Sequence, residues 1–163
     1  MKLVAKYNIP FATHDDDSPS RVDTYRIKGT TISEFPLNET TARYAIGNNM
    51  YVVVGSPNIL RNKSHSDNLS ARFAIMNGLA NIICSDYYCV ALLASVFILA
   101  EEGMSLHEAT SYASLYPAMA VGLADKIGSL EKGKEADLIL VRHARGEIPI
   151  VERAMVAGIW TLN

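Results

Sequence analysis

Short apolar runs alternate with longer mixed segments from the start of the chain to about residue 121. The apolar runs predict strands at 9–13, 30–35, 51–54 and 81–84. The clearest of them, Tyr51-Val52-Val53-Val54, is a continuous apolar run rich in β-branched residues, of the kind that parallel sheets bury on both faces. The mixed segments predict helices at 21–27, 39–46, 68–77, 90–102 and 105–114. Strands that alternate with helices indicate βαβ units and a parallel sheet.

Capping residues support two of these helix boundaries. Asn38 precedes the helix predicted at 39–46, and Ser105-Leu106-His107-Glu108 has the Ser-x-x-Glu form of a capping box. A polar stretch at 55–67 predicts a loop.

The pattern changes after residue 121. Short alternating strands separated by glycine are predicted at 128–130, 136–141 and 151–160. We therefore expect two domains, which are an α/β domain over residues 1–121 and a β-rich tail over residues 122–163.

Composition and charge limit the classes of protein to which this chain can belong. Hydrophobic residues make up 49% of the 163 residues and charged residues 20%, so the chain can bury a core. A net charge of −2 and the lack of a basic run argue against nucleic-acid binding. The longest uncharged stretch, 87–100, is too short to span a membrane, and no secretory signal opens the sequence. Two cysteines are too few for a disulfide framework, which favours a location in the reducing cytoplasm.

Polar residues follow the predicted strands, at the ends where α/β folds gather functional groups. His14 follows the first strand and is a natural metal ligand, and Asp86 follows the last and is a natural ligand and proton acceptor. Structural roles fit the same residues. His14 could be a loop residue whose neighbour Asp15 caps a helix, and Asp86 could cap the apolar helix that follows it.

The segment from Arg61 to Asn68 combines two cations, a histidine and two serines just before a predicted helix. Arg61, Lys63 and the backbone N–H groups of that helix start suit an anion, above all a phosphate. A solvated surface loop would have a similar composition, so both interpretations stay open.

The other candidate residues carry weaker signals. His107 lies inside the capping box and is expected to be structural, and His143 lies in a charged stretch and is expected at the surface. Cys84 is expected in the core within a strand. Glu34 ends a predicted strand, so a role in a site is open, but its spacing carries no signature.

Four motifs in order carry a resemblance to a known family. They are His14-Asp15-Asp16, Glu34-Phe35-Pro36, the segment Gly55 to Arg61 together with Ser64 to Ala71, and Ser85-Asp86-Tyr87. These motifs lie within residues 11–88 and closely resemble the phosphonate-utilisation branch of the amidohydrolase superfamily. Residues 122–138 resemble the generic ending of that superfamily, where the chain leaves a barrel and joins a small β-sandwich.

The resemblance implies a metal-dependent hydrolase with a TIM-like (β/α)8 barrel. The reaction would convert the 5-triphosphate of a ribose 1-phosphonate to the 5-phosphate and pyrophosphate. His14 would be a ligand to a divalent metal, Zn or Mn, and Asp86 would be the metal-bound carboxylate that serves as the base. The chemistry of the polar loop assigns the phosphorylated substrate to Asn58, Arg61, Lys63, Ser64, His65, Ser66 and Asn68.

Two departures from the family pattern change the expectation. The chain has no His-x-His, the pair that superfamily members contribute from the first barrel strand, and a complete barrel needs about 250 residues. We therefore expect the C-terminal half of a barrel, with an incomplete metal site and little activity by itself. Its open sheet edges would be covered by self-association or by a second polypeptide that carries the missing half.

Two alternatives to the phosphonate interpretation remain. The chain could belong to an amidohydrolase that opens a cyclic amide or deaminates a base, although the cations of the polar loop favour a phosphorylated substrate. It could also be an inactive half-barrel that serves as a scaffold or oligomerisation module.

Overall fold

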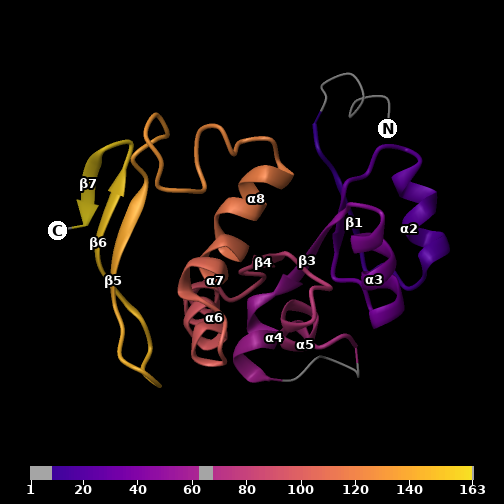
Figure 1. Cartoon of the computed structure of the whole chain (residues 1–163), viewed down its shortest axis with the longest axis horizontal. Coiled ribbons are helices and arrows are strands. Elements are labelled where there is room, and N and C mark those ends of the chain that lie inside the picture. The colour runs from indigo at the N-terminus through magenta and orange to yellow at the C-terminus, as the bar shows by residue number, and fades with distance from the viewer. Residues whose placement is uncertain (1–8, 63–67, 163) are drawn as a thin grey trace. The chain divides into compact units, whose positions relative to one another are not determined.

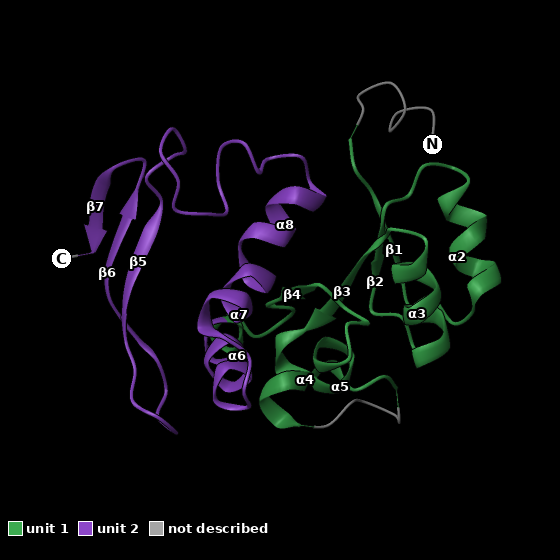
Figure 2. Cartoon of the chain, in the orientation of Figure 1, with its two compact units in different colours: residues 1–92 green, residues 93–163 purple. Residues whose placement is uncertain are grey.

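The computed structural model describes residues 9–62 and 68–162, which belong to two compact units (Figures 1 and 2). The first unit comprises residues 1–92 and the second comprises residues 93–163. None of the helices described is long and apolar enough to cross a membrane. The units divide after residue 92, and the domain boundary expected after residue 121 stays a prediction.

The first unit is built on a four-stranded sheet in the order β1-β2-β3-β4 (Figure 1). The strands are Ala12–His14 (β1), Ile32–Glu34 (β2), Tyr51–Gly55 (β3) and Ile82–Cys84 (β4). All neighbouring pairs are parallel, and the register places His14 beside Glu34. The predicted α/β class and parallel sheet are confirmed. The apolar residues of β3 and β4 form much of the buried core of this unit, as their continuous hydrophobic runs predict.

Each of the first three strands is followed by helix. The helices of this unit are Pro19–Arg26 (α2), Glu39–Gly47 (α3), Ser56–Arg61 (α4) and Ala71–Met76 (α5). The side chain of Asn38 accepts a hydrogen bond from the backbone N–H of Thr41, which confirms Asn38 as the cap of α3. Helix α3 buries Ala42 and Ala45, small residues that allow a helix to lie close to its neighbours.

The loop predicted over residues 55–67 is wrong for its first part, because Ser56–Arg61 is helical. Pro57 occupies the first turn, where its missing N–H has no intrahelical partner to lose, and Ile59 is fully buried. The helix predicted from residue 68 starts three residues later, at Ala71, because the Ser70 hydroxyl accepts from the N–H of Phe73. Residues 63–67 lie outside the described part of the chain.

The second unit contains helices followed by an antiparallel sheet. Its elements are α6 (Val90–Glu101), whose first turn belongs to the first unit, α7 (Leu106–Ala113), α8 (Leu115–Ala120), β5 (Leu138–Arg142), β6 (Ile150–Val156) and β7 (Ile159–Leu162). The sheet order is β5-β6-β7. At the start of α7 the Ser105 hydroxyl accepts from the N–H of Glu108, as the capping box predicts.

Two strand predictions in the tail are wrong. Residues 128–130 form no strand, because Gly128 has a φ of +94° and passes close to Ala118 of α8. The single strand predicted over 151–160 is a hairpin, because Ala157 and Gly158 both have positive φ, at 49° and 79°. Two consecutive residues with positive φ make the type of turn that reverses a strand in two residues.

Candidate functional site

One edge of the parallel sheet collects the polar strand ends. Because all four strands run in the same direction, their last residues, His14, Glu34, Gly55 and Cys84, lie at the same edge of the sheet. Asp86 follows two residues after β4. This edge is where α/β folds place ligands and catalytic groups, and we call it the carboxyl edge.

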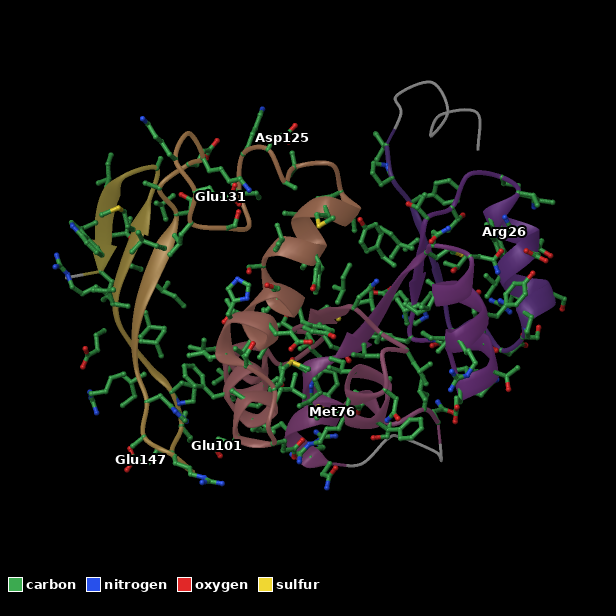
Figure 3. All side chains as sticks on the ribbon, in the orientation of Figure 1. Arg26, Met76, Glu101, Asp125, Glu131 and Glu147 are labelled. Carbon is green, nitrogen blue, oxygen red and sulfur yellow. The ribbon has the colours of Figure 1, made fainter. Side chains whose placement is uncertain are left out.

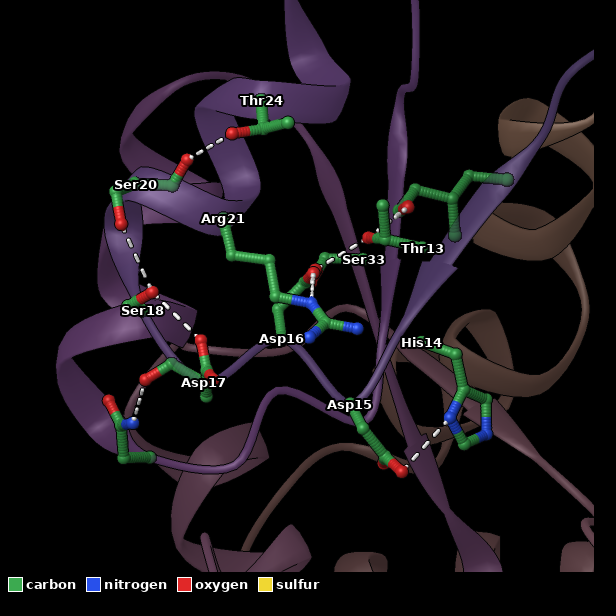
Figure 4. A network of polar contacts seen from close by, with 12 residues as sticks. Thr13, His14, Asp15, Asp16, Asp17, Ser18, Ser20, Arg21, Thr24 and Ser33 are labelled. Carbon is green, nitrogen blue, oxygen red and sulfur yellow. Dashed lines mark hydrogen bonds and ion pairs between the residues drawn. The ribbon is translucent and has the colours of Figure 1, made fainter. Parts of the chain in front are cut away.

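His14 lies between two carboxylates at the carboxyl edge. Its Nδ1 is 3.2 Å from Asp15 Oδ2, and its Nε2 is 3.7 Å from Glu34 Oε2 (Figure 4 shows the Asp15 contact). Phe35 meets the imidazole edge to face, with ring centroids 5.4 Å apart. The His14 side chain is 58% exposed, so solvent and ligands can reach it. Asp15 faces His14, and the residue that precedes α2 is Ser18, so Asp15 does not cap that helix.

The backbone turns sharply after three of the strands. Asp15, Phe35 and Asp86 have φ values of 54°, 54° and 51°, in the left-handed region. Asp15 N–H still donates to Glu34 O, and Phe35 N–H to Val53 O, so the parallel ladder continues to the turn itself. A left-handed conformation is unusual for a bulky residue such as Phe35, and strained residues of this sort cluster at functional sites.

Asp16 anchors the loop after β1. Its carboxylate is fully buried, and Oδ2 accepts hydrogen bonds from Thr13 Oγ1 at 2.5 Å and Ser33 Oγ at 2.6 Å (Figure 4). Oδ1 has no hydrogen bond among the described residues, and Arg21 Nε is 3.7 Å from it. In the sequence, Asp16 stands out only as a member of the His14-Asp15-Asp16 motif. Its structural role depends on Ser33, 17 residues away, which no local pattern reveals.

Asp86 lies over the end of β3. Its Oδ2 would be 3.5 Å from a Cβ built on Gly55, so a glycine there leaves room for the carboxylate. Helix α6 begins at Val90, four residues after Asp86, so Asp86 does not occupy its capping position. The pKa of the Cys84 thiol is raised to about 11, mainly by burial and in smaller part by the negative charges of Glu34 and Asp86. Both carboxylates therefore lie within electrostatic reach of Cys84.

The structure places His14 and Asp86 at the same edge but not in contact. They belong to the two outer strands of the sheet, and three strand spacings of about 4.8 Å separate those strands by roughly 14 Å. Over residues 9–62 and 68–162, no group of three or more His, Cys, Asp or Glu side chains could hold a metal ion. A nitrogen and an oxygen donor do come together at His14 and Glu34, so these residues fit part of a metal site.

The residues assigned to substrate lie on or after α4. Arg61 is exposed at the end of that helix, and its guanidinium carbon is 5.8 Å from the ring centroid of Tyr87, the residue after Asp86. Asn58 is half-buried within α4, and Asn68 is exposed. Lys63, Ser64, His65 and Ser66 lie outside the described residues. Of the described members of the predicted set, Arg61 is the one whose contact with the Asp86 loop the structure records.

Among the remaining candidates, the structure corrects one expectation. The expectation that His143 lies at the surface is wrong, because its side chain is 14% exposed and stacks on Phe97 at 4.2 Å. The His143 Nε2 atom is 3.3 Å from Oε1 of Glu101, the last residue of α6. Figure 3 labels Glu101. His107 is exposed in the first turn of α7, and Cys84 is partly buried at the end of β4.

Comparisons with known proteins give consistent matches. A family profile described as "Amidohydrolase family" matches residues 1–160. The chain is 35% identical over 145 residues to the alpha-D-ribose 1-methylphosphonate 5-triphosphate diphosphatase of Escherichia coli K12. The aligned region covers 87% of this chain and 38% of that protein. The chain therefore spans well under half the length of this curated relative.

Solved structures of low sequence identity share the fold. An amidohydrolase from Thermotoga maritima MSB8 matches with a TM-score of 0.76 and 20% identity, over 99% of this chain and 45% of that one. The N-acetylglucosamine-6-phosphate deacetylase from Pasteurella multocida matches with a TM-score of 0.68 and 14% identity, over 94% of this chain and 51% of that one.

Proposed function

This chain belongs to the amidohydrolase family, and we propose that it forms the C-terminal part of a metal-dependent hydrolase of phosphonate metabolism in the cytoplasm. The reaction is the cleavage of a ribose 1-phosphonate 5-triphosphate to the 5-phosphate and pyrophosphate. The support is the 35% identity, over most of this chain, with a protein named as a diphosphatase of such a substrate.

The proposed architecture is one half of a TIM-like (β/α)8 barrel, with residues 1–121 in the half-barrel and 122–163 in the tail of a small β-sandwich. Four parallel strands, each of the first three followed by helix, support the half-barrel. A three-stranded antiparallel sheet supports the tail. Strands β1 and β4 each leave one edge of the sheet unpaired among the described residues, and we propose that self-association or a complementary half-barrel chain covers these edges.

The observation that carries the proposed function is the convergence of polar strand ends at the carboxyl edge. His14 on one outer strand would contribute a nitrogen, and Asp86 after the other outer strand a carboxylate oxygen, to the centre of a divalent metal, Zn or Mn, whose remaining ligands lie outside the described residues; both metals accept such donors. When bound, the metal supplies Lewis-acid activation of water. Asp86 accepts the proton of the water that attacks the triphosphate, and Gly55 leaves the space in which its carboxylate lies.

The phosphate groups of the substrate are bound from the neighbouring segment. Arg61 is exposed and stacks on Tyr87, which holds a cation with planar, bidentate geometry beside the Asp86 loop. Asn58, Lys63, Ser64, His65, Ser66 and Asn68 complete the proposed set. This arrangement favours a phosphorylated substrate over a cyclic amide or a base.

The test is pyrophosphate release from the ribose phosphonate triphosphate by this chain mixed with the N-terminal part of the Escherichia coli relative. We expect release by the mixture, its loss in Asp86→Asn, and a raised KM in Arg61→Ala. Glu39→Gln, a substitution of an exposed residue on α3, is the matched control. Ring opening or deamination without pyrophosphate release would identify another amidohydrolase. A mixture that binds no metal and is unchanged by Asp86→Asn would identify a scaffold.

A further inference from the structure

His143 is a titratable residue of the second unit to which the proposed function gives no role. It begins the segment that joins β5 to β6, residues 143–149, which we call the β5–β6 loop. Its imidazole stacks on Phe97 of α6, with ring centroids 4.2 Å apart and ring planes at 29°. Because the side chain is 14% exposed, the first residue of this loop is docked on α6 rather than surrounded by solvent.

Glu101 is the residue of α6 that binds the β5–β6 loop. It ends the helix and is the one charged residue in the sequence of Val90–Glu101. Its Oε1 lies 3.3 Å from His143 Nε2 and accepts a hydrogen bond from the N–H of Gly146 at 2.8 Å. Phe97 lies four residues before Glu101, on the same face of the helix. One face of α6 therefore holds the loop through an aromatic ring and a carboxylate.

We propose that His143 and Glu101 form a pH-sensitive latch, which holds the β5–β6 loop on α6 more tightly when His143 is protonated than when it is neutral. All of its groups belong to the second unit, and the inference does not depend on the proposed hydrolase function. Histidine suits such a role because its ordinary pKa of about 6.5 lies within the physiological range.

A proton on His143 adds attraction on more than one side of the imidazole. The imidazolium gains the attraction of an opposite charge 3.3 Å away on Glu101, which a neutral ring lacks. The face of the Phe97 ring attracts a cation at this range as well. The carboxyl end of a helix carries partial negative charge, which favours a cation beside the last turn of α6. Burial of the ring opposes the charge in part, so we expect a modest effect.

The other charges on the neighbouring segments do not reverse this sign. They are Arg142, Arg145, Glu102, Glu147 and Glu152. The arginine on β5 pairs with the glutamate on β6 at 2.7 Å. The two charged residues of the loop are exposed and opposite in sign. Glu102 adds a second carboxylate next to Glu101. The carboxylate at the end of α6 therefore decides how the loop responds to pH.

The experiment measures, by NMR on the whole chain, how fast the Gly146 amide hydrogen exchanges with solvent at about pH 5.5 and about pH 7.5, on either side of the ordinary histidine pKa. The intrinsic rate at each pH, divided by the measured rate, gives the protection of this amide in the docked loop. We expect protection in the wild type to be about threefold higher at the lower pH, as suits a partly exposed ion pair. The change should follow the titration of the His143 imidazole, whose resonances are assigned with His143→Gln.

Three variants identify the groups of the latch. Glu101→Gln keeps an oxygen acceptor for Gly146 N–H but removes the charge, so its protection should be equal at the two pH values. His143→Gln should lose the response as well. Glu147→Gln removes an exposed carboxylate from the same loop and is the matched control, which should respond like the wild type (Figure 3 labels Glu101 and Glu147).

The circular dichroism spectrum of each variant separates release of the loop from unfolding of the sheet. A Glu101→Gln variant that keeps the wild-type response would overturn the proposal. So would a wild type with equal protection at both pH values, or with a response that follows a titration other than that of His143. These last two outcomes are read from the wild type alone, so the test does not depend on the folding of any variant.

Discussion

At the scale of single residues, the carboxyl edge depends on groups that are placed by non-local contacts. Asp16 is fully buried and receives hydrogen bonds from Thr13 on β1 and Ser33 on β2. Because its backbone carbonyl also accepts from Leu37 N–H, Asp16 ties the loop after β1 to the loop after β2. These two loops carry Asp15 and Phe35, the strained neighbours of His14.

Replacing Asp16 by alanine should destabilise the fold by about 3 kcal/mol, since two buried hydroxyls lose an ionised acceptor and Arg21 loses its carboxylate. Urea denaturation measures the change in the free energy of unfolding. Asp17→Ala removes an exposed carboxylate from the same loop and should cost under about 1 kcal/mol. Equal losses in the two variants would show that Asp16 has no anchoring role.

The two thiols should react at different rates with iodoacetamide. Cys89 is exposed, whereas the pKa of Cys84 is raised to about 11, so only about one Cys84 in a thousand is a thiolate at pH 8. The thiolate is the nucleophile, so alkylation of Cys84 should accelerate about tenfold per pH unit up to that pKa. Mass spectrometry of peptides from Cys84→Ser and Cys89→Ser separates the two sites.

The same reaction reports on the carboxylates of the site. Glu34→Gln and Asp86→Asn each remove a negative charge that raises the pKa of Cys84, so each should speed its alkylation at a fixed pH. Glu39→Gln should leave the rate unchanged. A rate that is insensitive to both site variants would place the carboxylates away from the thiol.

At the scale of elements, the sequence predicts what local patterns determine. Strands β3 and β4 and helix α3 lie where their apolar runs and the Asn38 cap indicate. Helix α4 was missed because Ser56, Pro57 and Asn58 are typical of loops, and its stability depends on burial of Ile59. The pairing of His14 with Glu34 was missed because strand register depends on contacts that lie far apart in sequence.

The predicted strand at 128–130 failed for a related reason, and it gives a matched pair of tests. A Cβ at Gly128 would lie 2.7 Å from Ala118 Cβ and 3.0 Å from Ser114 O, whereas one at Gly133 would meet nothing within 4 Å. Both glycines have positive φ, at 94° and 99°. Gly133→Ala should therefore cost about 1 kcal/mol from backbone strain alone, and Gly128→Ala about 3 kcal/mol.

Thermal denaturation of both variants measures the difference. The comparison isolates the contact of residue 128 with α8, since the backbone strain is shared. A Gly128→Ala variant no less stable than Gly133→Ala would mean that this segment does not pack on α8.

At the scale of the whole molecule, the four-stranded sheet is the feature that needs a partner. Its outer strands are β1 and β4, and each carries a row of backbone groups without a neighbouring strand among the described residues. The open edges support the proposed association with a complementary half, and the edge of β1 allows that proposal to be tested without disturbing the site.

Alternate N–H groups of β1 face opposite ways. Since Asp15 N–H donates to Glu34 O on β2, the N–H groups of Ala12 and His14 point away from β2, toward the open edge. Ala12→Pro removes one of these outward donors and leaves the ladder to β2 complete, as proline is tolerated on edge strands in that orientation.

Analytical ultracentrifugation measures the association. We expect the wild type to sediment as a dimer, or as a complex with the added complementary half. Ala12→Pro should weaken that association about tenfold, while the monomer keeps its circular dichroism spectrum. Ala12→Val, which keeps the N–H, should associate like the wild type. If Ala12→Pro associates as tightly as Ala12→Val, strand pairing at β1 does not hold the assembly together, and β4 becomes the edge at which the partner must be sought.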